Sequence, residues 1–354
     1  MNYALLSRYR SELMGFAIII VVMFHTYVER TDAFYGLHRI GSVGVDIFLL
    51  LSGIGLWFSW TKKALPNPSL KGGETTITGE HIFWKKYFSF IYRRLKRIYP
   101  TWLLLGSIHY ISRFHGHTTA DYVDLVLDIL FNWGFWTHGE LKLWYISAIM
   151  VMYLFAPFYM EVIRRWPVWR WSLVLSLMWC FAQQYVTPIH DSVGHIEIFW
   201  SRIPIFLIGM NIGEWVKQKR SISSDATPLL IVMLIASAAF CIYLEQVKHG
   251  EFPIFFERLL YIPLSISASL LLALLLDKTA TITSHKARFA SRLQTSLAFL
   301  GGISLEIYLL HFQFVMIYIF PHTRHYWPLL LLTLAATIPL AYLLSRLISL
   351  IVKR

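Results

Sequence analysis

Long apolar runs recur along the whole chain and are separated by short polar segments. Because about 20 apolar residues cross a bilayer as a helix, each run is a candidate membrane span. The ten runs lie near residues 13–28, 43–60, 98–112, 143–160, 169–187, 198–216, 227–247, 258–276, 297–320 and 327–352. The pattern predicts an all-α polytopic membrane protein with about ten transmembrane helices, forming a single domain over residues 1–354.

Two further segments are amphipathic. Residues 120–136 place Asp121, Asp124 and Asp128 on one helical face, which suits an interfacial helix better than a span. Residues 81–99 carry Lys and Arg on one half of the helix and aromatic and aliphatic side chains on the other. The segment 61–97 is expected to be a cytoplasmic loop, with a Pro- and Gly-rich first part and then this basic helix, which enters the third span at Pro100.

Basic residues gather in alternate loops. With ten spans and the N-terminus inside, about 24 Lys and Arg residues lie in the cytoplasm and about 8 outside, as the positive-inside bias predicts. An eleventh span at 120–136 would place the clusters at 164–170 and 217–220 outside. We therefore expect ten spans, with both termini cytoplasmic.

The composition agrees with a membrane protein. Of the 354 residues, 56% are hydrophobic and only 15% are charged, which a soluble globular surface does not allow and a disordered chain does not contain. The net charge of +12 is attributed to cytoplasmic loops, so the expected partner is the lipid bilayer and not nucleic acid. Cys180 and Cys241 are expected to be buried thiols, and no metal site is expected because no ligand set has zinc-site spacing.

Titratable side chains inside spans are costly and therefore mark candidate functional sites. His25 is predicted about 16 Å along the first span, measured from Met14 at 1.5 Å per residue, and Asp46 lies at a similar depth on the second span. A His–Asp pair at matched depth is typical of an oriented general base. Alternatively, each side chain reaches the interface or bonds a backbone carbonyl.

Other ionisable groups in the spans have a structural interpretation. Glu306 and His311 lie in the ninth span beside Tyr308, and Arg202 lies at the outer end of the sixth. Glu306 or Arg202 could form structural ion pairs, and for this group we favour structure over catalysis.

The basic helix 81–99 also allows two interpretations. Its Arg and Lys residues could anchor lipid headgroups and set the topology. They could instead bind a phosphorylated cytoplasmic ligand, because guanidinium groups match phosphate oxygens.

Five motifs occur in order along nearly the whole chain. They are Val22-Met23-Phe24-His25, Gly44-Val45-Asp46-Ile47-Phe48-Leu49-Leu50-Leu51-Ser52-Gly53, Arg93-Arg94-Leu95-Lys96-Arg97-Ile98-Tyr99-Pro100, Leu143-Trp144-Tyr145-Ile146 and Ser304-Leu305-Glu306-Ile307-Tyr308-Leu309-Leu310-His311. Together they resemble acyltransferase family 3, bacterial integral-membrane acyltransferases that modify surface polysaccharides, peptidoglycan and some secondary metabolites.

One position departs from the pattern: the family commonly has Arg where this chain has Met14. Arg10, one turn earlier on the same face, is the candidate substitute.

The resemblance implies an acyl-CoA-dependent O-acyltransferase of the bacterial cytoplasmic (inner) membrane. Acetyl-CoA is the expected co-substrate, with no permanently bound cofactor. The residues expected to meet its phosphates are Arg10, Arg93, Arg94 and Arg97. His25 would act as general base or carry the acyl group as a nucleophile, and Asp46 would orient it. Since either role needs a neutral imidazole, activity is expected to fall as the pH drops through the histidine pKa.

The resemblance further implies an acceptor that enters from the outer side. A carbohydrate or glycolipid hydroxyl is expected, with Trp144 and Tyr145 stacking on a sugar ring. The candidate acceptor or supporting residues are Ser52, Trp144, Tyr145, Arg202, Glu306, Tyr308 and His311.

A transporter or exporter of a small polar or glycan substrate is the alternative function. The buried charges would then line a translocation path. However, no Gly- or Pro-broken helix pair is repeated between the halves, as it is in many transporters. A non-catalytic scaffold would leave His25 and Asp46 unexplained.

Overall fold

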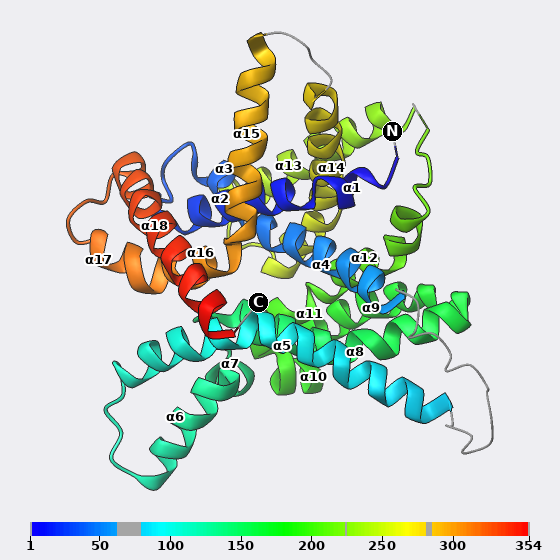
Figure 1. The fold of residues 1–354 in the computed structure, drawn as a ribbon. Coiled ribbons are helices and arrows are strands. Elements are labelled where there is room, and N and C mark those ends of the chain that lie inside the picture. The colour runs from blue at the N-terminus through cyan, green and yellow to red at the C-terminus, as the bar shows by residue number, and fades with distance from the viewer. Residues whose placement is uncertain (1, 62–78, 224, 281–284, 353–354) are drawn as a thin grey trace.

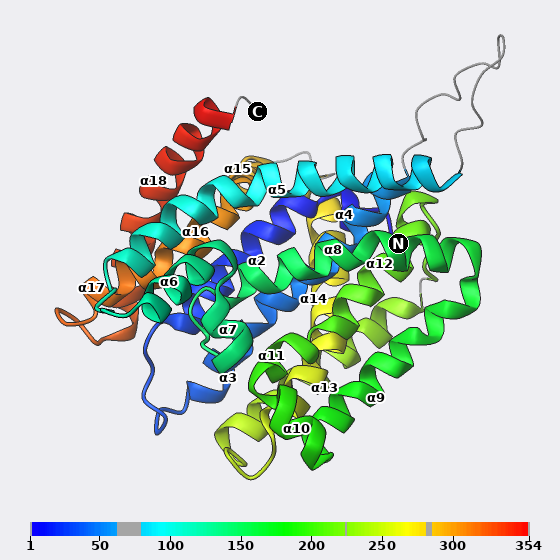
Figure 2. The ribbon, with the colours of Figure 1, turned by 90° about the horizontal axis from the view of Figure 1, so that it is seen from below.

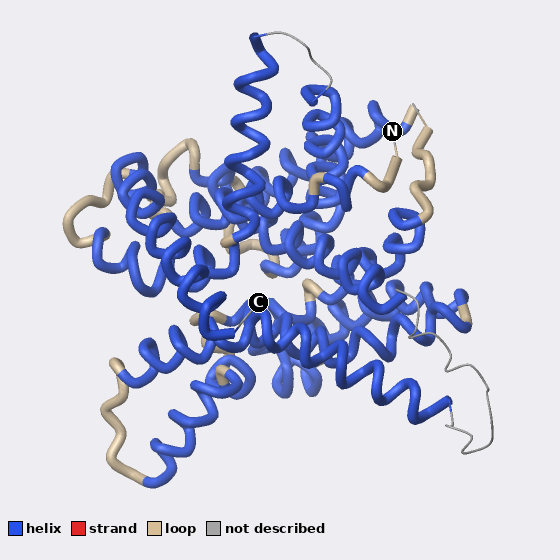
Figure 3. Tube along the Cα trace, in the orientation of Figure 1, coloured by secondary structure: helices blue, strands red, loops and turns tan. Residues whose placement is uncertain are grey.

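The computed structural model describes residues 2–61, 79–223, 225–280 and 285–352. Within these ranges every regular element is a helix (Figures 1 and 3), apart from one isolated β-bridge between Asn2 and Ser221. The Pro- and Gly-rich part of the predicted loop, residues 62–78, lies outside the described residues. The prediction of an all-α protein is confirmed for the described part of the chain.

The helices follow the apolar runs of the sequence. The first half of the chain contains α1 (Leu5–Arg8), α2 (Arg10–His25), α3 (Tyr35–Arg39), η1 (Ile40–Ser42), α4 (Val43–Thr61), α5 (Gly79–Ile111), α6 (Thr119–Phe131), α7 (Trp133–His138) and α8 (Trp144–Arg165). The second half contains η2 (Pro167–Trp171), α9 (Ser172–Tyr185), α10 (Thr187–Val193), η3 (Gly194–Ile196), α11 (Glu197–Trp200), α12 (Ile203–Lys217), α13 (Ala226–Gln246), α14 (Ile254–Ala280), α15 (His285–Gly302), α16 (Ser304–Leu310), η4 (His311–Met316), α17 (Ile317–Ile319) and α18 (Tyr326–Val352).

Five helical segments of the described chain are long and apolar enough to cross a membrane. They are Tyr35–Thr61, Trp144–Arg165, Ala226–Gln246, Ile254–Ala280 and Tyr326–Val352. Two bent helix pairs bring the number to seven if each is one span: Thr187–Trp200 with Ile203–Lys217, bent by 47°, and Ser291–Gly302 with Ser304–Ile319, bent by 64°. The protein is therefore a multi-pass membrane protein with five to seven candidate spans among its described residues.

The count of ten spans and the cytoplasmic termini stay predictions. Three predicted runs, 13–28, 98–112 and 169–187, lie on α2, α5 and α9, which are not among these candidates. The 16 residues of α2 and the 14 of α9 extend only about 24 and 21 Å, which is less than the hydrocarbon thickness of about 30 Å.

The predicted amphipathic helix and the predicted third span form one element. Helix α5 contains 33 residues and continues through Pro100. Figure 2 shows it running across the helix bundle. Tyr99 and Trp102 donate hydrogen bonds to the carbonyls of Leu130 and Ile129, at 3.2 and 2.9 Å, which hold the end of α6 against α5.

Helix α6 has the features of an interfacial helix. It contains 13 residues and none of them is buried. It begins with a capping box in which Thr118 and Asp121 each accept a hydrogen bond from the other's backbone N–H. The hydrogen bonds of the Asp121 carboxylate with Thr118 and with the backbone N–H of His117 lower its pKa. At about 20 Å, α6 is too short to cross the bilayer, which agrees with the predicted interfacial position.

Glycines allow α2 to pack closely against α15. A Cβ on Gly15 would lie 1.9 Å from the Leu297 carbonyl oxygen, and a Cβ on Gly301 would lie 1.9 Å from that of Ser11. Real carbon and oxygen atoms do not approach so closely, so any larger residue would separate the two backbones. This packing fixes α2, which carries Arg10 near one end and His25 at the other, against the helix that precedes α16.

Gly301→Ala is expected to destabilise the protein, and Gly302→Ala is its matched control. The new Cβ at Gly301 meets the backbone of α2, whereas the described structure has nothing within 4 Å of a Cβ at Gly302. Overpacking of this kind costs about 1–3 kcal/mol or more. Thermal unfolding in detergent should therefore show a lower Tm for Gly301→Ala and an almost unchanged Tm for Gly302→Ala. Equal Tm values for the two variants would contradict the close approach of α2 and α15.

Candidate active site

Two cavities lie near the two ends of α2. We call the first the arginine cavity, because Arg10, Arg94 and Arg97 line it, and the second the histidine cavity, because His25 and His311 line it. Met14 borders the first and Val21 the second; these residues are about 10 Å apart along the helix axis. The family motifs therefore converge on two adjacent spaces.

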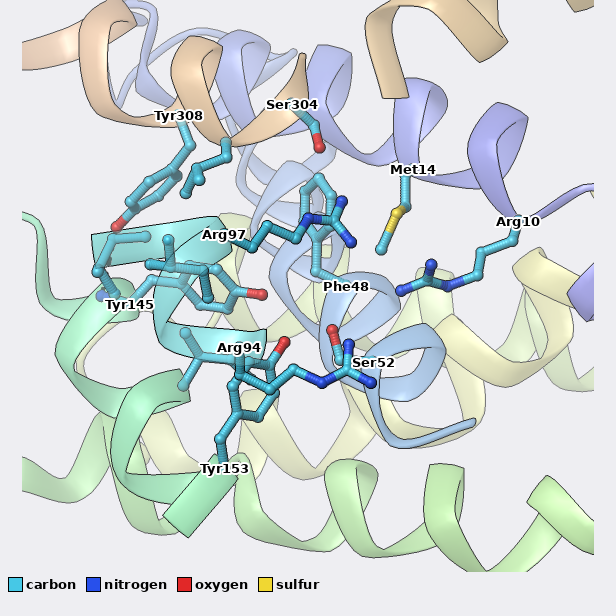
Figure 4. Close-up of a pocket in the computed structure, with 14 residues that line it drawn as sticks. Arg10, Met14, Phe48, Ser52, Arg94, Arg97, Tyr145, Tyr153, Ser304 and Tyr308 are labelled. Atoms are coloured by element: carbon cyan, nitrogen blue, oxygen red, sulfur yellow. Dashed lines mark hydrogen bonds between the residues drawn. The ribbon is translucent and has the colours of Figure 1, made fainter. Parts of the chain in front are cut away.

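The arginine cavity has a volume of about 70 Å³ and is enclosed by α2, α4, α5, α8 and α16. Figure 4 shows its three guanidinium groups directed toward the same space. Hydroxyl groups complete the polar lining, from Ser52, Tyr145, Tyr153, Ser304 and Tyr308. Among the described residues that line it, none is acidic. Three clustered cations without a lining carboxylate favour binding of a phosphate-bearing ligand.

Arg10 and Met14 line the arginine cavity together, one helical turn apart. The Arg10 guanidinium donates a hydrogen bond to the Leu51 carbonyl at 3.4 Å and lies beside Gly55, where a Cβ would come within 3.2 Å of it. The arginine one turn before Met14 thus reaches the space that borders the family's usual arginine position.

Arg93 does not line this cavity. It is exposed and donates a hydrogen bond at 2.6 Å to Ser89, one turn away on α5. Around α5, Arg97 lies between the other two arginines, about 60° from Arg94 and about 40° from Arg93, so Arg93 is rotated by about 100° from Arg94. Of the four arginines expected to bind acyl-CoA, the structure brings together Arg10, Arg94 and Arg97.

The histidine cavity has a volume of about 440 Å³, within the range of small-molecule sites. Its charged and histidine lining residues are His25, Arg39, Lys142, Arg202, Glu257, Arg258 and His311. Trp144, Tyr261, Tyr308, Phe312 and Gln313 add aromatic and amide groups. This lining combines candidate proton-transfer groups with groups suited to sugar binding.

The hydrogen bonds of His25 and His311 determine where their protons lie. His311 Nδ1 is 3.0 Å from the Ile307 carbonyl and 2.8 Å from the Tyr308 carbonyl, and His25 Nδ1 is 2.8 Å from the Val21 carbonyl. Since a carbonyl only accepts, both Nδ1 atoms carry hydrogen. His311 Nε2 is then an acceptor, and it lies 3.2 Å from His25 Nδ1. The single hydrogen on His25 Nδ1 is shared between the Val21 carbonyl and His311 Nε2, and His25 Nε2, which has no hydrogen-bond partner among the described residues, is the candidate base.

His25 and Asp46, which were expected to pair, each contact a different residue. The partner of His25 is His311, which starts the π-helical segment η4 and is 1% exposed. Asp46 is completely buried in α4, and its Oδ2 lies 3.9 Å from Arg202 Nη2. In this structure His311, and not Asp46, contacts Nδ1 of the His25 ring. The Asp46 carboxylate instead balances the charge of Arg202.

Tyr308 lines both cavities and separates them. Its hydroxyl accepts a hydrogen bond from the backbone N–H of Tyr145 at 3.4 Å, and the two rings pack edge to face with centroids 5.3 Å apart. Tyr308 therefore lies on the boundary between the two cavities.

The remaining predicted residues lie as follows. Ser52 and Tyr145 line the arginine cavity, and Trp144 and Arg202 line the histidine cavity. Glu306 is buried and lines neither cavity.

The residue before Trp144 is Leu143, a buried non-glycine residue with φ of 53°. This strained conformation begins α8 and directs Trp144 into the site.

The structure adds residues that the sequence analysis did not select. Arg39, Lys142, Glu257 and Arg258 line the histidine cavity, and Tyr153 lines the arginine cavity. Glu257 and Arg258 could have been selected from the sequence, because charged residues beside a long apolar run are candidate functional residues.

No group of three or more His, Cys, Asp or Glu side chains within the described residues could hold a metal ion.

The helices and these two cavities define a multi-pass membrane protein with a buried histidine site. A family model described as an acyltransferase domain matches residues 13–346, essentially the whole chain. The protein therefore belongs to acyltransferase family 3, as the motifs predicted. Comparisons with curated proteins and with solved structures gave no match.

Proposed function

We propose that this membrane acyltransferase transfers an acyl group, acetyl in the simplest case, from acyl-CoA to a hydroxyl of a carbohydrate-type acceptor. The observation that carries the proposal is the free Nε2 of His25, held at the opposite end of α2 from a cavity lined by three arginines. Acyl-CoA phosphates bind Arg10, Arg94 and Arg97 from the cytoplasm. The acceptor enters the histidine cavity from the outer side of the bacterial inner membrane.

The proposed reaction is a direct transfer with His25 as general base. His25 Nε2 takes the proton of the acceptor hydroxyl as its oxygen attacks the thioester carbonyl carbon. The oxygen–carbon bond forms, the carbon–sulfur bond breaks, and the CoA thiolate receives the proton from the imidazolium. His311 holds the ring through the Nδ1 hydrogen bond, so that Nε2 keeps its lone pair toward the cavity.

Binding and turnover of labelled acetyl-CoA test the proposed function. The purified protein in lipid nanodiscs is incubated with [14C]acetyl-CoA and a bacterial membrane glycolipid extract. We expect saturable acetyl-CoA binding, release of free CoA thiol, and label recovered as an alkali-labile ester in the extract. Absence of acetyl-CoA binding by folded protein, together with flux of a glycan through proteoliposomes without acetyl-CoA, would indicate the transporter instead.

A further inference from the structure

We infer that the histidine cavity selects an acceptor that carries an anionic group, a carboxylate or a phosphate, and that Arg202 and Arg258 bind this group. The inference rests on the proposed function, because it treats this cavity as the acceptor site. It adds the chemical class of the acceptor, which the family membership leaves open.

The charges that line the cavity are mainly positive. Four basic side chains face it (Arg39, Lys142, Arg202 and Arg258), against one carboxyl group, that of Glu257. The Glu257 carboxyl accepts a hydrogen bond from the Tyr261 hydroxyl. The cavity therefore presents more cationic groups than anionic ones to an acceptor.

The carboxylates paired with Arg39 and Arg258 do not line the cavity. Arg39 pairs with Glu245 at 3.4 Å, and Arg258 forms an ion pair with Glu197. Both arginines line the cavity, whereas neither glutamate does. A bound acceptor therefore meets these guanidinium groups directly, and Glu257 is the one carboxyl group among the described residues that line the cavity.

Arg202 has unused hydrogen-bond donors. It is 1% exposed, and among its nitrogens only Nη2 has a polar contact in the described structure: a hydrogen bond of 3.2 Å to Ser42 Oγ and the longer distance of 3.9 Å to Asp46. Nε and Nη1 have no hydrogen-bond partner in the described structure. Buried donors without partners are unfavourable, and an oxygen of a carboxylate or phosphate is a strong acceptor for such a charged donor.

The orientation of Arg202 is fixed before any ligand binds. Its guanidinium carbon lies 5.3 Å from the centroid of the Trp144 ring, and its backbone precedes the first turn of α12. Trp144 lines the same cavity and offers a flat surface to a sugar ring. A hexose ring with a charged substituent could therefore contact Trp144 and Arg202 together, while one of its hydroxyls faces His25.

Three hexoses that differ only at C6 test the inference. Equilibrium binding of labelled glucuronate, glucose 6-phosphate and glucose is measured on the purified full-length protein in nanodiscs, without acetyl-CoA. We expect at least one of the two anionic sugars to bind about tenfold or more tightly than glucose, and the preference to weaken at high salt. Comparison of the first two sugars shows whether the site takes the carboxylate or the phosphate.

Paired substitutions locate the site without leaving a buried charge unpaired. Asp46→Asn with Arg202→Gln is expected to abolish the preference for an anionic sugar. Glu197→Gln with Arg258→Gln is a second test at the other arginine, in case the first double variant does not fold. The matched control is Arg170→Gln with Glu214→Gln, which removes an ion pair outside both cavities and should keep the preference.

The outcomes separate this inference from the proposed function. If neither anionic sugar binds more tightly than glucose, or if the preference survives in the folded double variants, the inference is overturned, whatever the acetyl-CoA result. If the preference appears but no acetyl group is transferred to any acceptor, the anion site stands and the proposed function fails.

Discussion

Replacing His25 with alanine is expected to lower acyl transfer by about 10³-fold while the protein still inserts and folds. General-base catalysis contributes roughly 10²–10⁴-fold, and His25 Nε2 is the histidine nitrogen of the site that the hydrogen bonds leave as a free base. The measurement is acetyl transfer at saturating acetyl-CoA, with far-UV circular dichroism and size-exclusion chromatography as evidence of folding. Unchanged transfer in the folded variant would contradict the assignment.

His311→Ala supplies the matched test of the positioning residue. It should lower the rate by about 10–100-fold, and the double variant with His25→Ala should be no slower than His25→Ala alone, because the two rings act as one unit. A merely structural role for His311 would not move the pH dependence. Since transfer needs a neutral His25, the rate should fall in acid, and the pH of half-maximal rate should differ between His311→Ala and the wild type. An identical pH profile would contradict the contact seen between the rings.

The depth of a residue along a span could be predicted from the sequence, but its neighbour could not. Counting residues placed His25 and Asp46 at a similar level, and this suggested a pair. Which side chains meet depends also on how each helix is rotated about its axis and on which helix packs beside it. Here the close contact of α2 with α15 leads the chain into α16 and η4, so that His311 reaches His25 from a position 286 residues away.

The same limit applies to the basic helix. Its 100° periodicity predicted a basic face on α5, but a face that covers half the circumference does not identify the arginines that point inward. Short helices explain two of the three predicted spans that are not among the candidates: α2 and α9 are apolar in sequence, yet they contain only 16 and 14 residues. The ends of these two helices are determined by the turns that follow them and by the helices that pack beside them, and hydropathy describes neither.

The double substitution Arg94→Gln with Arg97→Gln is expected to raise the KM for acetyl-CoA by about 10²-fold. Each hydrogen bond between a guanidinium and a phosphate contributes about 1.5–3 kcal/mol, and both side chains line the arginine cavity. Because the phosphates lie far from the reacting thioester, kcat at saturation should change much less than KM. Steady-state kinetics and direct binding of CoA measure the two effects separately.

Arg93→Gln is the control that decides between the two interpretations of the basic helix. Arg93 is exposed, hydrogen-bonds Ser89 and lies outside the cavity, although it carries the same charge one residue away from Arg94. If the arginines bind CoA phosphates, Arg93→Gln should leave KM within about twofold of the wild type. If they only anchor lipid headgroups, the affinity for anionic lipid should fall by a similar amount for the loss of any one arginine, roughly 1 kcal/mol each, and KM should respond to none of them. An increase in KM confined to the two arginines of α5 that line the cavity would therefore distinguish a ligand site from a general surface charge.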